Sequence, residues 1–452
     1  MTEYVACKGN TVRTCRAGET VQTSLQGIAN KAKAEPKHRF QNLFGMIDQA
    51  LLMDSWRYLN LNAALGVDRV TAQEYARDLE GNLDRLVESL KEKRYRAKLI
   101  RRQYIPKANG KLRPLGILVI EDKLLQCAAT RILQAIYEQD FQPCSFGYRE
   151  GVGALDAVKT LTRELLFGRY GYVVEADIKG FFDAMSHQWL ERMLKERIDD
   201  ASMLWLIGKW LKAGVLDTDG KVIHPETGSP QGGIISPVLS NMYLHYALDL
   251  WFEKVIKPSC KGDAYLCRYA DDYVCLFRYK EDADRFFAVL GARMGKFGLE
   301  LAPDKTKILS FSRFRKWEKA SFEFLGFEFR WEVYTGGKDM VVRRTSPKKY
   351  HAALAELRKW CRTNRHLPLK RFFRTLKAKL RGHFNYYGVF GNFDSLKRFY
   401  HEAIGIVFKW HNRRSQYRSK TWDGFKELLK HFQVPKPRIV ECLFESKAAC
   451  SA

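Results

Sequence analysis

Two adjacent aspartates stand in a stretch that is otherwise apolar and aromatic, an unusual place for carboxylates. The segment LCRYADDYVCLF (266–277) carries Asp271 and Asp272 between two runs of residue types typical of half-buried strands. We therefore expect the acids at a tight turn between two strands. Neighbouring carboxylates against an apolar sheet repel each other and lose hydration, and a bound metal ion is the simplest way to keep both ionised. Taken alone, an Asp-Asp pair is most often an ordinary turn.

A second predicted strand also ends in an acid. The segment GYVVEADIKGFF (171–182) has the pattern of a buried strand that ends near Asp177. Between the two acidic sites, residues 228–249 begin as a Gly- and Pro-rich loop and continue as a predicted long helix. A helix N-terminus behind such a loop suits an anionic or polar ligand, and a plain loop-to-helix joint is the simpler alternative.

The chain is strongly basic. Its 452 residues include 77 Lys and Arg against 51 Asp and Glu, a net charge of +26. Such a surface attracts polyanions, which favours a nucleic-acid-binding protein over a membrane-surface protein. We expect no membrane association and a cytoplasmic location, because the sequence has no apolar run long enough to cross a bilayer and no signal-peptide core. The ten cysteines contain no Cys-x-x-Cys pair, which argues against structural zinc and disulfides.

The pattern of elements divides the chain into four parts. Residues 1–44 are polar and weakly periodic, and we interpret them as a loosely ordered lead-in. Residues 45–312 mix helical patterns with short strand patterns, which predicts an α+β body. Residues 313–430 begin with a strand at 322–331 and continue as basic helices, and residues 431–452 form a C-terminal tail.

Most of the net charge is concentrated in the predicted helices near the C-terminus. Between Arg343 and Lys420, 21 Lys or Arg residues stand against three acids, which gives +18 of the total +26. Two of these helices have apolar stripes, formed by Tyr350, Ala353, Leu354, Leu357, Trp360 and Cys361 and by Phe373, Leu376, Leu380 and Phe384. On the second helix a separate face carries Lys370, Arg374, Lys377 and Arg381. A merely solvated face would mix both signs, so this face favours contact with a phosphate backbone.

Taken together and in order, these segments resemble the successive blocks of reverse transcriptases, and specifically of the group II intron-encoded reverse transcriptase/maturase family. The matching segments, within about residues 45–430, are GVDRVT (66–71), YIPKANGKLRPLGI (104–117), FGYREGVGALDAV (146–158), ADIKGFFDAM (176–185), SPQGGIISPVLSNMYL (229–244), RYADDYVCLF (268–277), LAPDKTKIL (301–309), FLGFEF (324–329), RGHFNYYG (381–388) and WHNRRSQYRSKTW (410–422).

The resemblance implies a right-hand polymerase, with fingers and palm at 45–312 and a helical thumb, or maturase domain, at 313–430. It implies primer-dependent DNA synthesis on an RNA template, with deoxynucleoside triphosphates and two Mg²⁺ ions. By the same resemblance, Asp177 and Asp271 hold the ions together with the backbone carbonyl of Ile178, and Asp272 completes the acidic triad. Neighbouring strand residues face opposite sides, so Asp271 and Asp272 are not expected to be equivalent.

Further roles follow from the matched positions. Phe182 corresponds to the aromatic residue that closes on the sugar C2′ position and favours deoxynucleotides. Arg113 corresponds to the fingers residue that grips the triphosphate, where a guanidinium suits bidentate contact. The remaining nucleotide-binding candidates are Lys107, Lys111, Gln231 and Lys305.

The resemblance also implies the partners of the protein. These are an RNA template, a DNA primer and structured RNA, in particular a group II intron whose splicing and mobility the protein would assist. The candidates for RNA contact are Arg413 and Arg414 in NRRSQ (412–416), with the basic face that carries Lys370, Arg374, Lys377 and Arg381. Access to a bacterial nucleoid is expected, and the oligomeric state is left open.

Two alternatives remain open from the residues. The first is an RNA-binding splicing cofactor with an idle polymerase site, against which the three intact acids argue. The second is a free-standing reverse transcriptase that serves DNA repair or defence. Family members with endonuclease activity carry a further His-Asn-His domain. The given sequence ends with VPKPRIVECLFESKAACSA (434–452), which leads us to expect a form without that domain.

Overall fold

A four-stranded antiparallel sheet with the order β6-β7-β3-β8 forms the centre of the molecule. Its strands are β6 (Ala264–Tyr269), β7 (Asp272–Phe277), β3 (Tyr172–Asp177) and β8 (Lys307–Ser310). The structure is a computed structural model that describes residues 11–106, 110, 112–314, 320–333, 336–414 and 419–441, with side chains from residue 20 onward. Both predicted strands with acidic ends are confirmed, and so is the α+β class.

Alternating side chains let this sheet bury both faces. On one face Val174, Leu266 and Phe277 pack into the large core with Phe286 of helix α12 (Lys280–Lys296). On the other face Val173 and Val274 pack with Phe322 and helix α6 (Ala154–Phe167). The sheet is therefore clamped between two cores, which leaves its strand ends as the places where polar side chains reach solvent.

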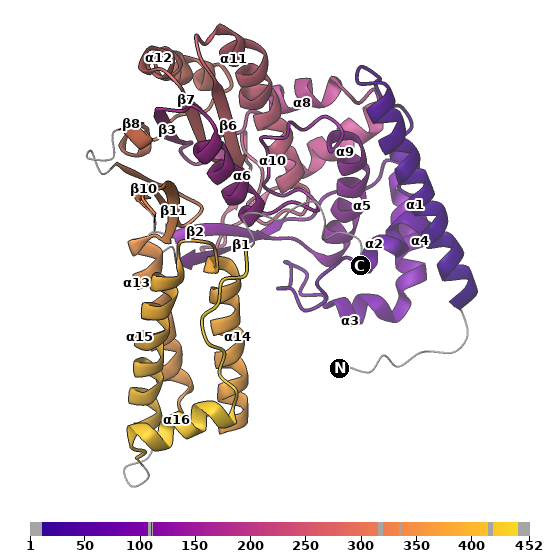
Figure 1. Cartoon of the computed structure of the whole chain (residues 1–452). Helices are drawn as coiled ribbons and strands as arrows, with labels where there is room; N and C mark the ends of the chain where they lie inside the picture. Colours follow the sequence, from indigo (N-terminus) through magenta and orange to yellow (C-terminus); the bar gives the residue numbers. More distant parts are fainter. Residues whose placement is uncertain are drawn as a thin grey trace.

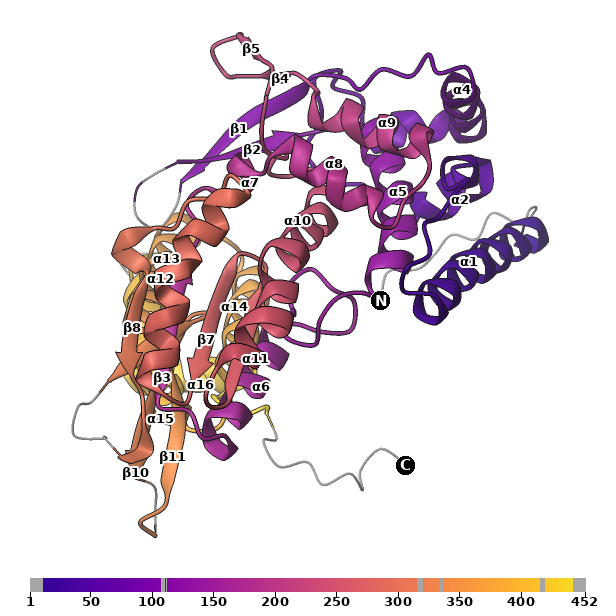
Figure 2. The same cartoon turned by 90° about the horizontal axis from the view of Figure 1, so that it is seen from above.

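Helices and short turns complete the body around the sheet (Figures 1 and 2). The loop at 228–235 leads into α10 (Ser236–Leu244), which continues through the π-helical segments η3 (His245–Asp249) and η4 (Phe252–Ile256) to α11 (Lys257–Ser259), as the sequence predicted. The other helical elements are η1 (Phe44–Met46), α2 (Gln49–Trp56), α3 (Ala72–Tyr75), η2 (Ala76–Asp78), α4 (Leu79–Lys91), α5 (Ile120–Tyr137), α7 (Phe181–Ala184), α8 (His187–Lys195), α9 (Ala201–Leu211) and η5 (Pro303–Lys305).

The lead-in does not match its prediction. Residues 11–34 form helix α1 (Thr11–Ala34), so the expectation of a loosely ordered segment is wrong for this range. Val21, Leu25 and Ile28 are buried at helical spacing and join the main core, where α1 packs on α2 and α5. The stripe is narrow and lies among polar residues, which explains why the sequence pattern was weak.

A second four-stranded sheet has the order β2-β1-β4-β5. β1 (Ile100–Pro106) and β2 (Leu112–Ile117) form an antiparallel hairpin, and β4 (Val215–Leu216) joins β1 in parallel before the short hairpin to β5 (Val222–Ile223). In Figure 2 the β4–β5 hairpin projects away from the helices.

A three-stranded sheet connects the body to the C-terminal helices. It consists of β9 (Ser321–Phe324), β10 (Phe327–Val333) and β11 (Asp339–Thr345). The prediction of one strand over 322–331 is wrong, because the chain reverses at Leu325 and Gly326, where φ is 50° and 82°. Glycine adopts such a positive φ at little cost, so the Leu-Gly pair is a turn rather than strand interior.

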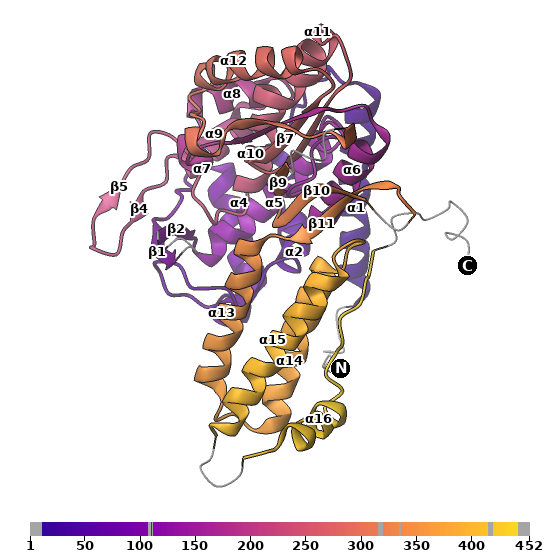
Figure 3. The same cartoon turned by 60° about the vertical axis from the view of Figure 1, so that its left-hand side comes forward.

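The C-terminal helices pack as a bundle that extends from this sheet (Figures 1 and 3). They are α13 (Pro347–Asn364), α14 (Leu369–Tyr387), α15 (Phe393–Asn412) and α16 (Trp422–His431). Both predicted apolar stripes are confirmed, since Leu354, Leu357 and Phe373 are among the buried residues of the bundle core. No helix in the described ranges is long and apolar enough to span a membrane.

A C-terminal segment (residues 433–441) returns from α16 along the bundle toward β10 and β11 (Figure 3). Its end is fixed by Glu441, whose two carboxylate oxygens accept hydrogen bonds from Arg343 Nη1 and Nη2 at 2.8 and 2.6 Å. Arg343 is fully buried, and the Val440 amide donates to the Gly388 carbonyl at 2.7 Å. A buried guanidinium without a counter-charge is strongly destabilising, so this ion pair fastens the segment to the sheet.

Replacing Glu441 by Gln should therefore lower the free energy of unfolding by about 2–4 kcal/mol, because it leaves the buried Arg343 without a full counter-charge. Urea unfolding measures the change. The matched control is Glu427→Gln, which removes an exposed partner of Lys430 and should cost less than about 0.5 kcal/mol. Equal losses in the two variants would contradict a stabilising role for the buried pair.

Candidate active site

The two acidic strand ends meet in the central sheet. Asp177 is the last residue of β3 and Asp272 the first of β7, and the antiparallel register places them directly opposite each other. Opposite residues in a sheet point to the same face, so both carboxylates border one cleft of about 820 Å³. The turn of Ala270 and Asp271 joins β6 to β7, as the sequence predicted. The three acids therefore lie within one strand-end region.

Segment 301–305 is held against Asp177 and Ile178. The Ala302 amide donates to the Asp177 carbonyl at 2.8 Å, and Ile178, which is buried, forms a bridge with Leu301. This contact brings Lys305 to the acids, and its ammonium group forms an ion pair with the Asp177 carboxylate. The structure thus brings together Asp177 and Lys305, which are far apart in the sequence.

Burial and mutual repulsion raise the pKa values of the acids in this region. Burial is the main cause for Asp272, whose pKa rises to about 6, and the charges of Asp271 and Asp177 add to it. Lys305 and Lys349 oppose this rise. Burial also raises the pKa of Asp271, with a further contribution from Asp177, while Arg113 and Arg268 act in the opposite direction. The site concentrates negative charge that a cation would relieve.

The donor set suits a hard divalent cation only in part. In the described ranges, no group of three or more His, Cys, Asp or Glu side chains is arranged to hold a metal ion. The three acids are therefore close in the fold without forming a ready cluster of three carboxylates. Mg²⁺ is commonly held by one or two carboxylates together with substrate phosphates. The paired carboxylates of Asp177 and Asp272 on one cleft wall are compatible with that mode.

A second group of predicted residues surrounds the loop before α10. The Ser229 amide donates to the Phe182 carbonyl at 2.8 Å, so this loop lies on the turn that follows Asp177. The Gln231 carbonyl accepts a hydrogen bond from the Gly116 amide of β2 at 2.5 Å. A Cβ atom on Gly232 would come within 2.4 Å of the Gly116 carbonyl oxygen, so the close approach needs glycine. The half-buried Phe182 and Gln231 thereby lie along a path from β2 to the acids.

The predicted cations are distributed between two regions. Arg113 is exposed on β2, and its charge acts on Asp271, which places it on the side of the acids. Lys107 and Lys111 lie outside the described residues. Lys370, Arg374, Lys377 and Arg381 lie on α14 in the bundle. Arg413 and Arg414 follow α15, where Arg414 donates to the Leu367 carbonyl at 2.7 Å near the start of α14.

Sequence reasoning missed the residues that the helical bundle contributes to the acidic cleft. Lys349 of α13 and Tyr386 of α14 both line it, and the Tyr386 hydroxyl donates to the Leu325 carbonyl at 2.8 Å. Both belong to the bundle, so they reach the acids only through the tertiary contact with the β9–β10 turn. No local pattern in the sequence could have indicated that contact.

Comparisons with known proteins cover the part of the chain that carries these residues. Residues 105–329 match the family model described as reverse transcriptase (RNA-dependent DNA polymerase). Protein YkfC of Escherichia coli (strain K12) is 30% identical over 315 residues, which cover 62% of this chain and 82% of that protein. The chain belongs to the reverse transcriptase family.

Relatives of this reverse transcriptase include proteins named for introns. The group II intron-encoded protein LtrA of Lactococcus lactis subsp. cremoris is 43% identical over 167 residues, which cover 37% of this chain and 27% of LtrA. Nuclear intron maturase 4, mitochondrial, of Arabidopsis thaliana is 25% identical over 122 residues, which cover 27% of this chain and 15% of that protein. The resemblance to group II intron-encoded reverse transcriptases is thus confirmed, although the match spans about a quarter of the length of LtrA.

In this reverse transcriptase, replacing Asp272 by Asn should increase stability at neutral pH in the absence of divalent cations. The carboxyl group has a pKa of about 6 in the fold against 3.8 ordinarily, so the folded protein binds more protons between these values. Wild-type stability therefore falls as pH rises through this window, and the variant should gain about 1 kcal/mol above pH 6 after allowance for solvent screening.

Urea unfolding at pH 4 and pH 8 checks this expectation. The gain should be present at pH 8 and much smaller at pH 4, where the carboxyl group is protonated in the folded state and still partly protonated in the unfolded state. Asp304→Asn, which alters another acid of the same cleft, is the matched control and should change little at either pH. A gain of equal size at both pH values would contradict the assignment of the effect to the Asp272 charge.

Proposed function

We propose that this reverse transcriptase synthesises DNA on an RNA template from a primer, with a right-hand layout. The β1–β2 hairpin and its helices act as fingers, the central sheet acts as the palm, and α13–α16 act as the thumb. The observation that carries the proposal is the gathering of three acids at adjacent strand ends. Asp177 lies directly opposite Asp272, Asp271 stands in the turn just before Asp272, and Lys305 contacts Asp177. The family match over 105–329 supports the same reading.

The chemistry needs the acids to hold cations beside the primer end. We assign Asp177 and Asp271, with the backbone carbonyl of Ile178, as ligands for two Mg²⁺ ions and Asp272 as a supporting acid. When bound, such ions activate the primer 3′ hydroxyl and stabilise the triphosphate and its leaving group. Asp177 must release Lys305 from its ion pair to accept a cation, and the freed ammonium can then approach the leaving pyrophosphate.

The residues between β2 and the acids form the proposed nucleotide site. Arg113 grips the triphosphate from the fingers, and Lys107 and Lys111, which lie outside the described residues, are proposed to assist it. Phe182 lies under the loop that carries Gln231, and its ring would exclude a 2′ hydroxyl while Gln231 lines the pocket. The hydrogen bonds that join Ser229 to Phe182 and Gly116 to Gln231 support one shared pocket.

Replacing Asp271 by Asn should reduce primer extension on an RNA template on the order of 10³-fold, because the carboxamide keeps the shape but loses the charge that binds a cation. Template–primer affinity should stay within about twofold. Single-nucleotide incorporation and a filter-binding assay measure the two quantities. Asp304→Asn is the matched control and should retain near-normal extension. Sustained synthesis by Asp271→Asn would remove this residue from the metal site.

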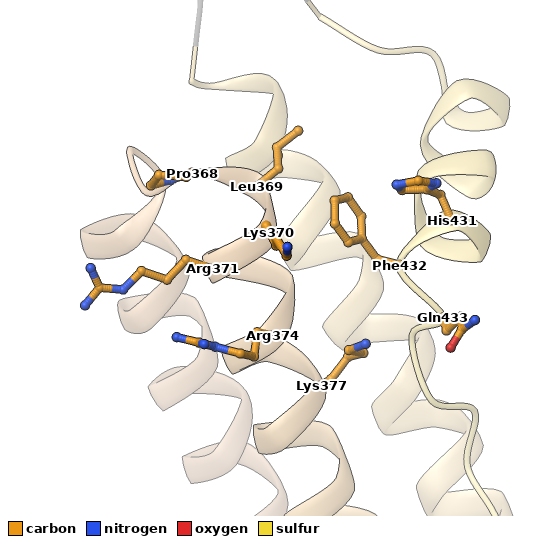
Figure 4. Close-up of a pocket in the computed structure, with 9 residues that line it drawn as sticks. All are labelled: Pro368, Leu369, Lys370, Arg371, Arg374, Lys377, His431, Phe432 and Gln433. Atoms are coloured by element: carbon orange, nitrogen blue, oxygen red, sulfur yellow. The ribbon is translucent and has the colours of Figure 1, made fainter. Parts of the chain in front are cut away.

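RNA contact is proposed for the basic face of α14. The groove there has a volume of about 880 Å³ and is bordered by Lys370, Arg371, Arg374 and Lys377 on one side. In Figure 4 Lys370 and Lys377 lie on the side of α14 that faces Phe432 and Gln433 at the end of α16, whereas Arg371 and Arg374 extend toward the other side of the helix. Phe432 stacks on Phe373 with ring centroids 4.3 Å apart, which closes the base of the groove with apolar surface.

The groove continues along α14 toward the body of the protein. A second hollow of about 510 Å³ shares Gln433 and adds three cations, Arg381, Lys436 and Arg438. Among the described residues, none of the seven cations that border the two hollows has an ion-pair partner, and no acid lines either hollow. A row of unpaired cations along an elongated groove suits a polyanionic backbone. We therefore include Lys436 and Arg438 of the C-terminal segment in the RNA surface, with Arg413 and Arg414 near its outer end.

We further propose that this surface binds structured intron RNA and assists its splicing. The names of LtrA and of intron maturase 4 refer to introns, and the matched segments support carrying that role to this chain. Splicing of the flanking RNA at near-physiological Mg²⁺, with and without the protein, tests it. Protein-dependent excision supports a maturase, whereas no excision with intact primer extension favours a free-standing reverse transcriptase.

Changing Lys370, Arg374, Lys377 and Arg381 together to Gln should weaken RNA binding and reduce the slope of log affinity against log salt by about 2–3, because fewer counterions are released. A matched control changes four exposed lysines of η4, α11 and α12, which removes the same charge at the other end of the molecule. These are Lys254, Lys257, Lys280 and Lys296. An unchanged slope in the α14 variant, or an equal change in the control, would exclude this groove as the RNA track.

A further inference from the structure

A buried arginine stands behind the turn that carries Asp271. Arg268, on β6, has no exposed surface, and its side chain belongs to the face of the sheet that packs on the helices. It forms an ion pair with Asp249 of η3, which is also fully buried. The acids of the site lie at the solvent side of the same strand ends, so Arg268 does not reach the cleft itself.

All five N–H donors of the Arg268 guanidinium are used. Nε and Nη2 donate to the two Asp249 carboxylate oxygens at 2.7 and 2.5 Å, and Nη2 also donates to Ser145 Oγ at 2.7 Å. Nη1 donates to Asn241 Oδ1 at 3.1 Å and to the Ala270 carbonyl at 3.0 Å. An ion pair alone needs only the first two bonds, so the other three carry a further role.

The bond to the Ala270 carbonyl bears directly on the active-site turn. Ala270 has φ of 55°, a left-handed conformation that is unfavourable for a residue with a side chain, so surrounding contacts must hold it. The next residue is Asp271, and the peptide between the two is the one that Arg268 fixes. The orientation of this peptide sets where the Asp271 side chain leaves the backbone.

The same network packs a loop against the turn. The Arg268 amide donates to the Cys144 carbonyl at 2.8 Å, and its carbonyl accepts from the Phe146 amide at 2.9 Å. Asn241 donates to the Gly147 carbonyl at 2.5 Å. A Cβ atom on Gly147 would come within 2.3 Å of the Ala270 nitrogen, so loop and turn are in direct backbone contact. Helix α10, η3, the loop and the turn are thus joined through one side chain.

We propose that Arg268 is a positioning residue, which fixes the Ala270–Asp271 peptide and so sets the Asp271 carboxylate for cation binding. The inference rests on the proposed function of Asp271. The planar guanidinium is required because it addresses Asp249, Asn241, Ser145 and the turn carbonyl at once. A lysine in its place keeps a positive charge beside Asp249 but lacks the several N–H donors of the guanidinium. The ion pair is therefore retained, while the hydrogen bond to the Ala270 carbonyl of the turn is lost.

The experiment compares Arg268→Lys with the wild-type protein in cation binding and in turnover. Mn²⁺ affinity, measured by electron paramagnetic resonance with template–primer and a non-hydrolysable nucleotide, should fall at least fivefold. The Mg²⁺ concentration for half-maximal incorporation should rise by a similar factor and kcat should fall at least tenfold. KM for the nucleotide and template–primer affinity should stay within about threefold, because neither surface touches Arg268.

Arg197→Lys is the matched control. Arg197 is another buried arginine, paired with Asp140 and bonded to the Glu35 and Ala32 carbonyls in the N-terminal part of the body. Its variant should lose comparable thermal stability with unchanged cation affinity. Ser145→Ala, which removes one acceptor, is the milder variant if Arg268→Lys does not fold, and it should weaken Mn²⁺ binding about twofold.

The outcomes separate the inference from the proposed function. Unchanged Mn²⁺ affinity in folded Arg268→Lys, or an equal loss in Arg197→Lys, overturns the positioning role. If Arg268→Lys does not fold, unchanged Mn²⁺ affinity in Ser145→Ala overturns it. A wild-type protein that neither binds Mn²⁺ nor extends a primer overturns the proposed function instead.

Discussion

The opposition of Asp177 and Asp272 at neighbouring strand ends is the constraint on which the site depends. Like charges directly opposite each other in a sheet destabilise the pairing, and burial adds to this cost. The fold meets the cost by making the rest of the same strands a two-sided apolar sheet, clamped between two cores. It also brings cations to the acids from outside the sheet, Lys305 by direct contact and Lys349 from the bundle.

This arrangement explains why the acids sit at the ends of strands and not inside them. A strand interior buried on both faces offers no solvent and no room for substrate, whereas a strand end keeps the backbone fixed and opens the side chain to a cleft. The turn at 270–271 is held from behind by a fully satisfied guanidinium, through the hydrogen bond that Arg268 donates to the Ala270 carbonyl. Rigidity and accessibility are thus provided by opposite sides of the same turn.

Most of the site residues could be predicted from the sequence, but fewer of the contacts that hold them in place could be. The strand ends at Asp177 and Asp272 and the apolar stripes of the bundle were predictable, because each is written in local periodicity. Helix α1 was missed since its buried stripe, which includes Val21 and Leu25, is narrow and lies among polar residues. The β9–β10 turn was missed because Leu325 has a positive φ, which is not expected for a leucine. Lys349 was missed because it reaches the acids from the bundle, which is distant in sequence. Arg268 was missed because its partners are brought together only in the buried interior of the fold.

The buried arginines and the cations of the α14 groove differ in whether they have an ion-pair partner, and this difference matches their different roles. Arg268 and Arg343 are buried, and each forms an ion pair with a carboxylate. Their charge is therefore neutralised within the protein and stabilises the fold. The seven cations along α14 and the C-terminal segment have no such partner within the described ranges, and their charge remains available to a polyanion. Glu441 links the two groups, because its bond to Arg343 holds the segment that completes the groove. Loss of that bond would therefore loosen one wall of the groove while leaving the α14 cations in place.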